Sequence, residues 1–188
     1  KSTKSRIVYL KPGATFTQYN RVAILEPLVE FEKGWQKDYN NSHRGLEGRV
    51  SDKDIDRMKA GLAAEFKKVF TKELQDKGGY QVVTEPGPDT LLVIPAIIDL
   101  YMTAPETMSP GRTRTYTANS GRMTLVLEIR DSVTGETLAR VVDGRSGRTS
   151  GVMTVTNRAT NTADARRAIR IWAQALRNGL DSLYKGGA

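Results

Sequence analysis

SDKDIDRMKAGLAAEFKKVFTKELQDKGGYQVVTEPGPDTLLVIPAIIDLYM, residues 51–102, is the stretch that decides the fold class. Its first half places apolar side chains at steps of three and four residues, which predicts one buried stripe on an amphipathic helix: Ile55, Met58, Leu62, Phe66, Val69 or Phe70, and Leu74. Ser51 can cap this helix, and the aspartates that follow favour the positive end of its dipole. Gly78-Gly79 predicts its end. Lysines 67, 68, 72 and 77 lie mostly off the stripe, which indicates a solvated helix face.

The second half of the stretch predicts two strands. YQVVT (80–84) reads as a short strand, EPGPD as a turn and TLLVIPAIIDLYM (90–102) as a long strand. The near-continuous apolar composition of the long strand predicts burial on both faces over part of its length. Pro95 predicts a bulge or a local edge, because proline cannot donate a hydrogen bond to the ladder.

Towards the C-terminus the pattern predicts a hairpin and a second helix. GRMTLVLEIRD (121–131) alternates apolar and polar side chains, and SVTGE turns the chain back into TLARVVD (137–143). The second helix is expected from about residue 163 to 184, with Asn161 or Thr162 as its cap and Asp164 placed for a capping box. Its predicted buried stripe is Ala165, Ala168 or Ile169, Trp172, Leu176, Leu180 and Leu183.

The N-terminal part shows weaker patterns. Residues 1–20 are expected to form a tether and lead-in, and RVAILEPLVEF (21–31) one strand with an edge or bulge at Pro27. Residues 32–50 read as a long polar loop. The order of elements predicts an α+β fold for a single domain over 21–185: a mixed, mostly antiparallel sheet of about five strands with two amphipathic helices packed on one face.

Composition excludes several kinds of chemistry. The 188 residues contain no cysteine, which excludes disulfides, thiolate metal sites and cysteine nucleophiles, and His43 is the one histidine. No acidic spacing typical of a metal loop and no GxSxG elbow is present. We therefore expect no metal, no cofactor and no catalytic residue. No run approaches the roughly 18 apolar residues of a membrane-spanning helix, and the start at Lys1 suggests a processed or trimmed chain.

Arginine dominates the positive charge of the C-terminal half. The net charge is +8, and residues 103–188 carry 13 basic against 7 acidic side chains, of which 12 of the 13 are arginine. In GRTRTYTANSGR (111–122), an extended chain would point Arg112, Arg114 and Tyr116 to one side, where they could bind a phosphate, a carboxylate or a sugar edge. The same pattern also suits an edge strand protected by charge.

A second arginine segment lies in DGRSGRTSG (143–151). It lacks the spacing of a phosphate loop. Its Arg145 and Arg148 could supplement Arg112 and Arg114 only if the fold brings the two loops together. The sequence predicts these residues, with Tyr116, as the ligand-binding surface.

Two other functions stay open at the sequence level. A nucleic-acid-binding domain would explain the basic charge, but no RNA-binding aromatic motif, GxxG clamp or zinc finger is present, which disfavours it. A hydrolase could use carboxylates such as Asp99, Glu106, Glu128 or Asp131, provided that two of them meet in a pocket with raised pKa values.

Four segments together resemble a bacterial lipoprotein family known only as a domain of unknown function. They are YLKPGATFTQYNRVAILEPLVEFEKGW (9–35), GGYQVVTEPGPDTLLVIPAIIDLYMTAPETM (78–108), GRTRTYTANSGRMTLVLEIRDSVTGETLARVVD (111–143) and NRATNTADARRAIRIWAQALRNGLD (157–181). The order helix, GGYxVV, apolar strand is also similar to small α/β envelope domains such as the N-terminal domain of TolB. Fold-level likeness of this kind does not carry function.

The resemblance implies an envelope protein made with a signal peptide. It would be lipidated at a cysteine just upstream of Lys1, face the periplasm and be anchored to the outer membrane, touching the membrane only through that lipid. We expect a non-enzymatic domain that binds an envelope protein or an anionic ligand. Its oligomeric state stays open.

Overall fold

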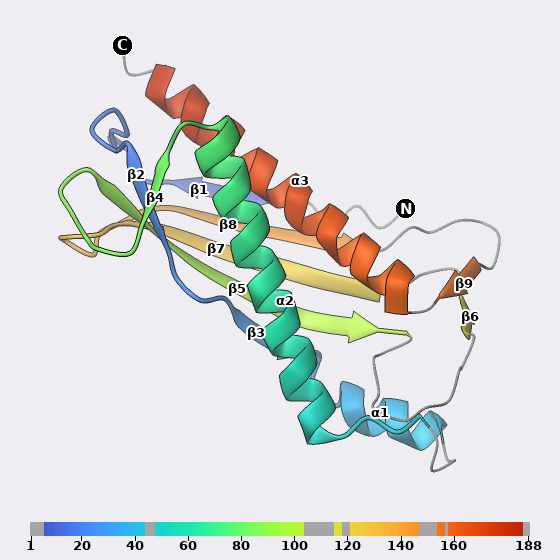
Figure 1. Ribbon diagram of the computed structural model, residues 1–188. Helices are drawn as coiled ribbons and strands as arrows, with labels where there is room; N and C mark the ends of the chain where they lie inside the picture. The colour runs from blue at the N-terminus through green and yellow to red at the C-terminus, as the bar shows by residue number, and fades with distance from the viewer. Residues whose placement is uncertain are drawn as a thin grey trace.

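The computed structural model describes residues 6–43, 48–103, 115–117, 121–146, 154–156 and 158–185. Its main sheet has seven strands in the order β1-β8-β7-β5-β2-β4, with β3 also pairing with β5 (Figure 1). The strands are β1 (Ile7–Leu10), β2 (Arg21–Ile24), β3 (Leu28–Phe31), β4 (Gln81–Val83), β5 (Thr90–Met102), β7 (Gly121–Asp131) and β8 (Thr137–Ser146). The β2–β4, β2–β5 and β3–β5 pairs are parallel and the others antiparallel. The predicted α+β class is confirmed, with seven strands in place of about five.

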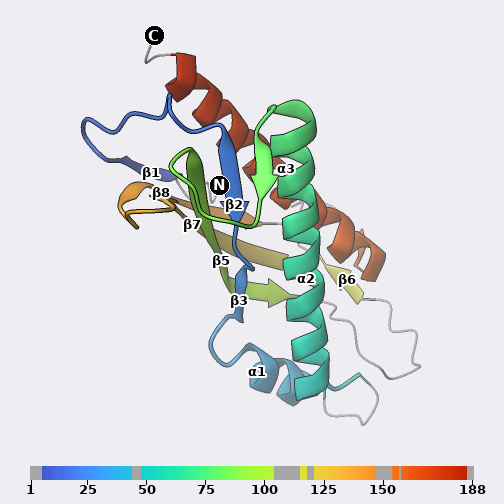
Figure 2. The same cartoon turned by 60° about the vertical axis from the view of Figure 1, so that its left-hand side comes forward.

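Two long helices, α2 (Asp52–Lys72) and α3 (Arg158–Lys185), lie against the same face of the sheet (Figures 1 and 2). The predicted cap of α2 is confirmed: the backbone N–H of Asp54 donates to Ser51 Oγ at 3.2 Å, and Asp54 Oδ2 accepts from the backbone N–H of Ser51 at 2.9 Å. A π-helical turn, η1 (Glu73–Lys77), follows α2 and ends at Gly78. The glycine pair therefore ends the helix as predicted.

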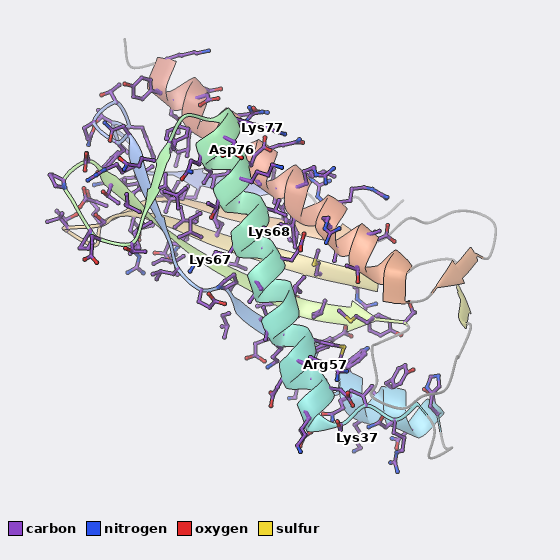
Figure 3. All side chains as sticks on the ribbon, viewed as in Figure 1. Lys37, Arg57, Lys67, Lys68, Asp76 and Lys77 are labelled. Atoms are coloured by element: carbon purple, nitrogen blue, oxygen red, sulfur yellow. The ribbon has the colours of Figure 1, made fainter. Side chains whose placement is uncertain are left out.

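The core lies between these helices and the sheet. The predicted stripe of α2 is buried, with Phe66 and Phe70 fully inside, and so is that of α3, centred on Ile169 and Trp172. They pack against alternating residues of β5 and β7: Leu91, Val93, Ile97, Leu125, Leu127 and Ile129. Each such side chain contributes about 1.5–3 kcal/mol when it leaves water. Lys67 and Lys68 project away from the sheet on the exposed side of α2 (Figure 3), as the helix pattern predicts.

Pro95 lies where the ladder on one side of β5 is interrupted. The register of β2 ends at Ile24 opposite Val93, and that of β3 begins at Leu28 opposite Ala96. Pro95 therefore pairs only with Leu127 of β7, and its missing N–H costs no hydrogen bond. The predicted local edge is confirmed. The expected single strand over 21–31 is wrong, because the chain breaks at Leu25–Pro27 into β2 and β3.

The structure corrects two helix predictions: one helix was missed, and another begins earlier than expected. Residues 32–50, interpreted as a loop, contain the helix α1 (Trp35–Ser42). Its rings stack at a four-residue spacing, Trp35 on Tyr39 with centroids 5.6 Å apart, and Phe31 of β3 lies 4.5 Å from Trp35. Helix α3 begins at Arg158, so the cap predicted at Asn161 or Thr162 is wrong. The apolar period starts only at Ala165 and therefore gave no signal for the first turn.

Residues 6–20 join the domain closely. Ile7–Leu10 form the edge strand β1, which pairs antiparallel with β8, and Phe16 and Tyr19 are buried in the core. No strand was predicted here, because four residues are too few to show a pattern of their own. The pairing that makes them a strand is long-range.

Candidate functional site

A cavity of about 280 Å³ lies between α3 and the β1–β8 end of the sheet. One wall is the side of α3 that carries Ala175, Gly179 and Ser182, and the opposite wall is Val8 and Leu10 of β1. Its remaining lining is mostly core side chains of β7, β8 and α3, including Leu127, Val141 and Leu180. Folded interiors hold few voids larger than a water molecule, so an apolar opening of this size needs an explanation.

The sequence of α3 makes this space. Ala175, Gly179 and Ser182 follow one another at helical spacing on the side next to the buried stripe of Trp172 and Leu176. A Cβ built on Gly179 would meet nothing within 4 Å. A helix-interior glycine costs roughly 0.5–1 kcal/mol relative to alanine. The small side chains therefore leave a gap towards β1 that no side chain in the described part of the molecule fills.

The outer wall of the cavity is unusually exposed for its composition. Val8 is 57% and Leu10 41% exposed, although both point to the helix side of the sheet beside Val141 and Ala139. Their partners in β8 are much better covered. An occupant between β1 and α3 would remove these two side chains from water.

Among the described residues that line the cavity, Asp143 is the one carboxylate, and it is only 4% exposed. Its Oδ2 accepts a hydrogen bond from Trp172 Nε1 at 2.8 Å and another from Arg145 Nε at 2.9 Å. Buried charges are stable only when they are paired in this way. The contact ties β8 to α3 and fixes the indole ring in the cavity wall.

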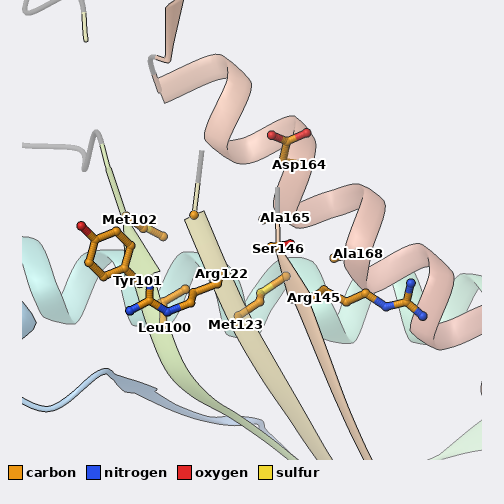
Figure 4. Close-up of a pocket in the computed structure, with 11 residues that line it drawn as sticks. Leu100, Tyr101, Met102, Arg122, Met123, Arg145, Ser146, Asp164, Ala165 and Ala168 are labelled. Atoms are coloured by element: carbon orange, nitrogen blue, oxygen red, sulfur yellow. The ribbon is translucent and has the colours of Figure 1, made fainter. Parts of the chain in front are cut away.

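A smaller pocket of about 50 Å³ lies at the neighbouring end of the sheet (Figure 4). Arg145 lines it together with Arg122, Tyr101 and Asp164. The Arg122 guanidinium lies over the ring of Tyr101, 4.2 Å from its centroid, and also pairs with Glu32. Both arginines in this pocket therefore already have anionic partners.

The predicted ligand surface is described only in part. Arg112, Arg114 and Arg148 lie outside the described residues. Tyr116 belongs to β6 (Thr115–Thr117), which pairs antiparallel with β9 (Thr154–Thr156) and places Tyr116 opposite Val155. This pairing joins residues 115–117 to residues 154–156. The predicted surface itself stays a prediction.

The carboxylates considered for hydrolysis do not form a catalytic pair in the described part of the chain. Hydrogen bonds from Arg130 and Thr137 lower the pKa of Glu128 to about 2. The backbone N–H of Thr134 and the hydroxyl of Tyr19 lower the pKa of Asp131 to about 2 as well. Asp99 is exposed, and Glu106 lies outside the described residues.

The cavity was missed by sequence reasoning, although one signal for it exists. Ala175, Gly179 and Ser182 form a small-residue stripe beside an otherwise well-filled apolar one. Its meaning depends on β1, which the sequence does not reveal.

Among the residues that the structure describes, no three acidic, histidine or cysteine side chains come close enough to hold a metal ion. None of the described helices combines the length and apolar character needed to span a bilayer.

Several solved structures are similar in chain course at low identity. The PelC dodecamer from Paraburkholderia phytofirmans is 11% identical with a TM-score of 0.47, covering 92% of this chain and 98% of that one. A minor lipoprotein from Acinetobacter baumannii is 12% identical with a TM-score of 0.42, covering 87% and 94%. A DUF4136 family protein from Bacteroides thetaiotaomicron is 11% identical with a TM-score of 0.42, covering 96% of each chain. Similarities this weak say nothing about the function of the chain.

Comparison with curated proteins gave no match. The predicted similarity to the N-terminal domain of TolB is not shown and stays a prediction. The family comparison is decisive, because the sequence model of one family matches residues 1–176. The chain belongs to DUF3313, a family of proteins of unknown function.

Proposed function

We propose that the chain is a non-enzymatic binding domain of the bacterial cell envelope whose ligand is an amphiphile with an apolar chain and an anionic head. The observation that carries this proposal is the apolar cavity of about 280 Å³ between α3 and β1. Ligand pockets are typically concave, mostly apolar and provided with a few polar groups that fix orientation. The cavity has each of these properties, and its volume lies near the lower end of the usual range for ligand pockets.

The apolar part of the ligand would lie between the small-residue side of α3 and the β1 wall. Each methylene group transferred from water into such a site contributes about 0.8 kcal/mol. Covering Val8 and Leu10 adds to that gain, since both are exposed. Branched or aromatic groups would fit less well, because the space is bounded by strand side chains on one side and helix side chains on the other.

The anionic head would lie at the rim. Arg6 is the one cation that lines the cavity in the part of the chain that the structure describes, and it is exposed. The buried carboxylate of Asp143 would repel a negative head placed deep inside. The two charges therefore orient an amphiphile with its chain inward and its head towards Arg6.

Two features support a binding role without catalysis. A general acid at neutral pH needs a raised pKa, whereas the pKa values of Glu128 and Asp131 are lowered. Asp143 Oδ2 accepts hydrogen bonds from both Trp172 and Arg145, which form a structural contact. A carboxylate held in this way cannot shuttle a proton without breaking the contact.

The envelope location is part of the same proposal. It rests on the family resemblance, which implies a signal peptide and a lipidated cysteine upstream of Lys1, with the domain facing the periplasm at the outer membrane. The full-length precursor should incorporate an alkyne-tagged fatty acid and fractionate with outer membranes. Incorporation should be lost when the upstream cysteine is replaced. An untagged, freely soluble product would contradict this location.

Binding of a fluorescent fatty acid to the purified 188-residue chain tests the ligand proposal. Gly179→Leu should weaken binding at least tenfold, because the new side chain enters the space next to Gly179. Gly61→Leu is the matched control: this glycine is also exposed in a helix interior, and a Cβ there also meets nothing within 4 Å, but it lies on α2 away from the cavity.

Both substitutions should raise the stability of their helix by roughly 0.5–1 kcal/mol. Loss of binding in Gly179→Leu with a raised melting temperature therefore cannot be attributed to unfolding. Equal binding by the two variants, or no binding by the wild-type chain, would refute the proposal that the cavity binds an amphiphile.

A second candidate is an anionic ligand bound by Arg112, Arg114 and Tyr116 with Arg145 and Arg148. The pairing of β6 with β9 favours it, because it connects the strand that carries Tyr116 to the segment that follows β8 in the chain. Arg145 would have to leave Asp143 or bridge to the ligand. This site and the cavity are separable by mutation.

A further inference from the structure

The two long helices carry more than half of the net positive charge of the chain. Residues 65–77 of α2 and η1 and residues 166–177 of α3 together contain eight basic and three acidic side chains, a net charge of +5 out of +8 for the whole chain. The helices lie next to each other on the sheet, so these residues form one layer (Figure 1). Seven of the eight basic side chains are exposed and one is half-buried. They are named the basic helix face here: Lys67, Lys68, Lys72, Lys77, Arg166, Arg167, Arg170 and Arg177.

A single carboxylate at the contact between the helices stands among three of these cations. Arg166 donates to Glu65 at 2.5 Å, and this hydrogen bond lowers the pKa of the Glu65 carboxyl. The nearby charges of Lys68 and Arg170 lower that pKa further. The one negative charge of Glu65 therefore cannot neutralise the positive charge around it.

Three members of the face have no carboxylate partner of their own. Lys68, Lys72 and Arg170 form no ion pair with any residue that the structure describes, whereas each of the other five lies within 4 Å of a carboxylate. Lys68 and Lys72 are one helical turn apart, and so are Arg166 and Arg170. Like charges at this spacing repel each other. The arrangement costs the fold stability that an external anionic partner would restore.

The face is too wide for one small anion. At a rise of about 1.5 Å per residue, the stretches from Lys67 to Lys77 and from Arg166 to Arg177 are each about 15 Å long. The axes of packed helices lie about 8–10 Å apart. A single phosphate or carboxylate could reach only a few of the eight cations. The partner therefore has to present an extended array of anionic groups.

The face also lacks the side chains that a protein or a nucleic acid would use. Protein interfaces are centred on aromatic and other large anchors, and single-stranded nucleic acids stack on aromatic rings. Among the described residues, none of the large apolar or aromatic side chains that are exposed falls in 65–77 or 166–177. Both helices lie along the sheet (Figures 1 and 2), so neither is placed to enter the major groove of a duplex.

We propose that the basic helix face binds the surface of an anionic phospholipid bilayer. Such a surface attracts clusters of lysine and arginine without a pocket for any one headgroup. Each basic side chain close to it strengthens binding about fivefold, and the attraction falls off within a Debye length. Exposed cations on a broad helix layer meet these requirements.

Cosedimentation of the 188-residue chain with vesicles of phosphatidylethanolamine and phosphatidylglycerol tests the proposal. The wild-type chain should bind these vesicles at about 50 mM salt and much less at about 500 mM, since salt shortens the Debye length. It should not bind vesicles of phosphatidylcholine alone. Lys68→Gln combined with Lys72→Gln and Arg170→Gln should weaken binding about a hundredfold, because three contributions of about fivefold are lost. Glutamine is a good helix former, so the melting temperature should stay nearly unchanged.

Lys33→Gln combined with Lys37→Gln and Lys53→Gln is the matched control. It removes the same number of positive charges from exposed lysines. These lysines lie beside or in α1 and in the first turn of α2, at the other end of α2 from the basic helix face (Lys37 is labelled in Figure 3). This control should weaken vesicle binding by less than about fivefold.

Three results would overturn the proposal: no binding of the wild-type chain to the anionic vesicles, binding that does not fall with salt, and equal weakening by the two triple variants. Binding of a DNA duplex in place of vesicles, lost in the helix-face variant, would overturn it in favour of a nucleic acid. Gly179→Leu should leave vesicle binding unchanged, because it fills the cavity and leaves the basic helix face intact. Failure of this proposal and failure of the cavity proposal are therefore distinguishable.

Discussion

Replacement of Trp172 by phenylalanine is expected to destabilise the fold by about 3 kcal/mol. The substitution removes the Nε1–H group that donates to the buried carboxylate of Asp143 at 2.8 Å. A hydrogen bond to a charged group contributes about 1.5–3 kcal/mol, and Arg145 remains as a partner, which favours the lower part of that range. Loss of part of the indole volume in a site only 3% exposed adds roughly 1 kcal/mol.

The chain provides a matched control in its other tryptophan. Trp35 is similarly buried, at 4%, but its Nε1 donates to the neutral carbonyl oxygen of Met102 at 3.0 Å. The same Trp→Phe change there should cost about 1–1.5 kcal/mol less, because a neutral hydrogen bond contributes only about 0.5–1.5 kcal/mol. The acceptor is charged at Trp172 and neutral at Trp35, and the stacking of Trp35 on Phe31 and Tyr39 can be kept by a phenylalanine ring.

Urea unfolding followed by far-ultraviolet circular dichroism measures both free energies. For a chain of this length, about 3 kcal/mol corresponds to a fall in the melting temperature of about 6–12 °C. In the background of Asp143→Asn, Trp172→Phe should lose less stability, with a coupling of about 1–2 kcal/mol. A cost for Trp172→Phe no larger than that for Trp35→Phe, or no coupling to Asp143, would refute the assignment of this pair as a structural brace.

Three more predictions concern other parts of the molecule. Because the folded-state pKa values of Glu128 and Asp131 are lowered to about 2, both carboxylates contribute stability that is complete above about pH 5 and is lost as the pH falls towards 2. Glu128→Gln should flatten the acid side of a melting-temperature profile, and an unchanged slope would contradict the stated contacts. Gly79→Ala should cost about 1 kcal/mol, because Gly79 has a φ of +74°, and unchanged urea unfolding would show that this turn is not strained. Arg112→Ala with Arg114→Ala should weaken binding to an anionic envelope component such as lipopolysaccharide, measured by calorimetry, with a nearly unchanged melting temperature; a large loss of stability would assign the pair to structure.

The parts of the fold that depend on the spacing of residues close together in the chain could be predicted from the sequence. The stripe of α2 and its cap at Ser51 are examples, since apolar spacing and a capping box act within one helix. Helix α1 was missed because it is held by ring stacking of Phe31, Trp35 and Tyr39 rather than by an apolar stripe. Strand β1 was missed because it exists only through its pairing with β8.

The candidate site could be predicted much less well. Its walls come from Val8 and Leu10 at one end of the chain and from Gly179 near the other, and nothing in the sequence states that they face each other. Arg145 was singled out for its charge, and the structure places it in a pair with Asp143.

Photo-crosslinking with a diazirine-bearing fatty acid tests the central claim most directly. After irradiation of the complex and proteolysis, mass spectrometry should locate the label on β1 around Val8 and Leu10 and on α3 around Ala175 and Gly179. The Gly179→Leu variant should lose that label while Gly61→Leu keeps it. Labels confined to α2, with β1 and α3 unmodified, would contradict a ligand in the cavity.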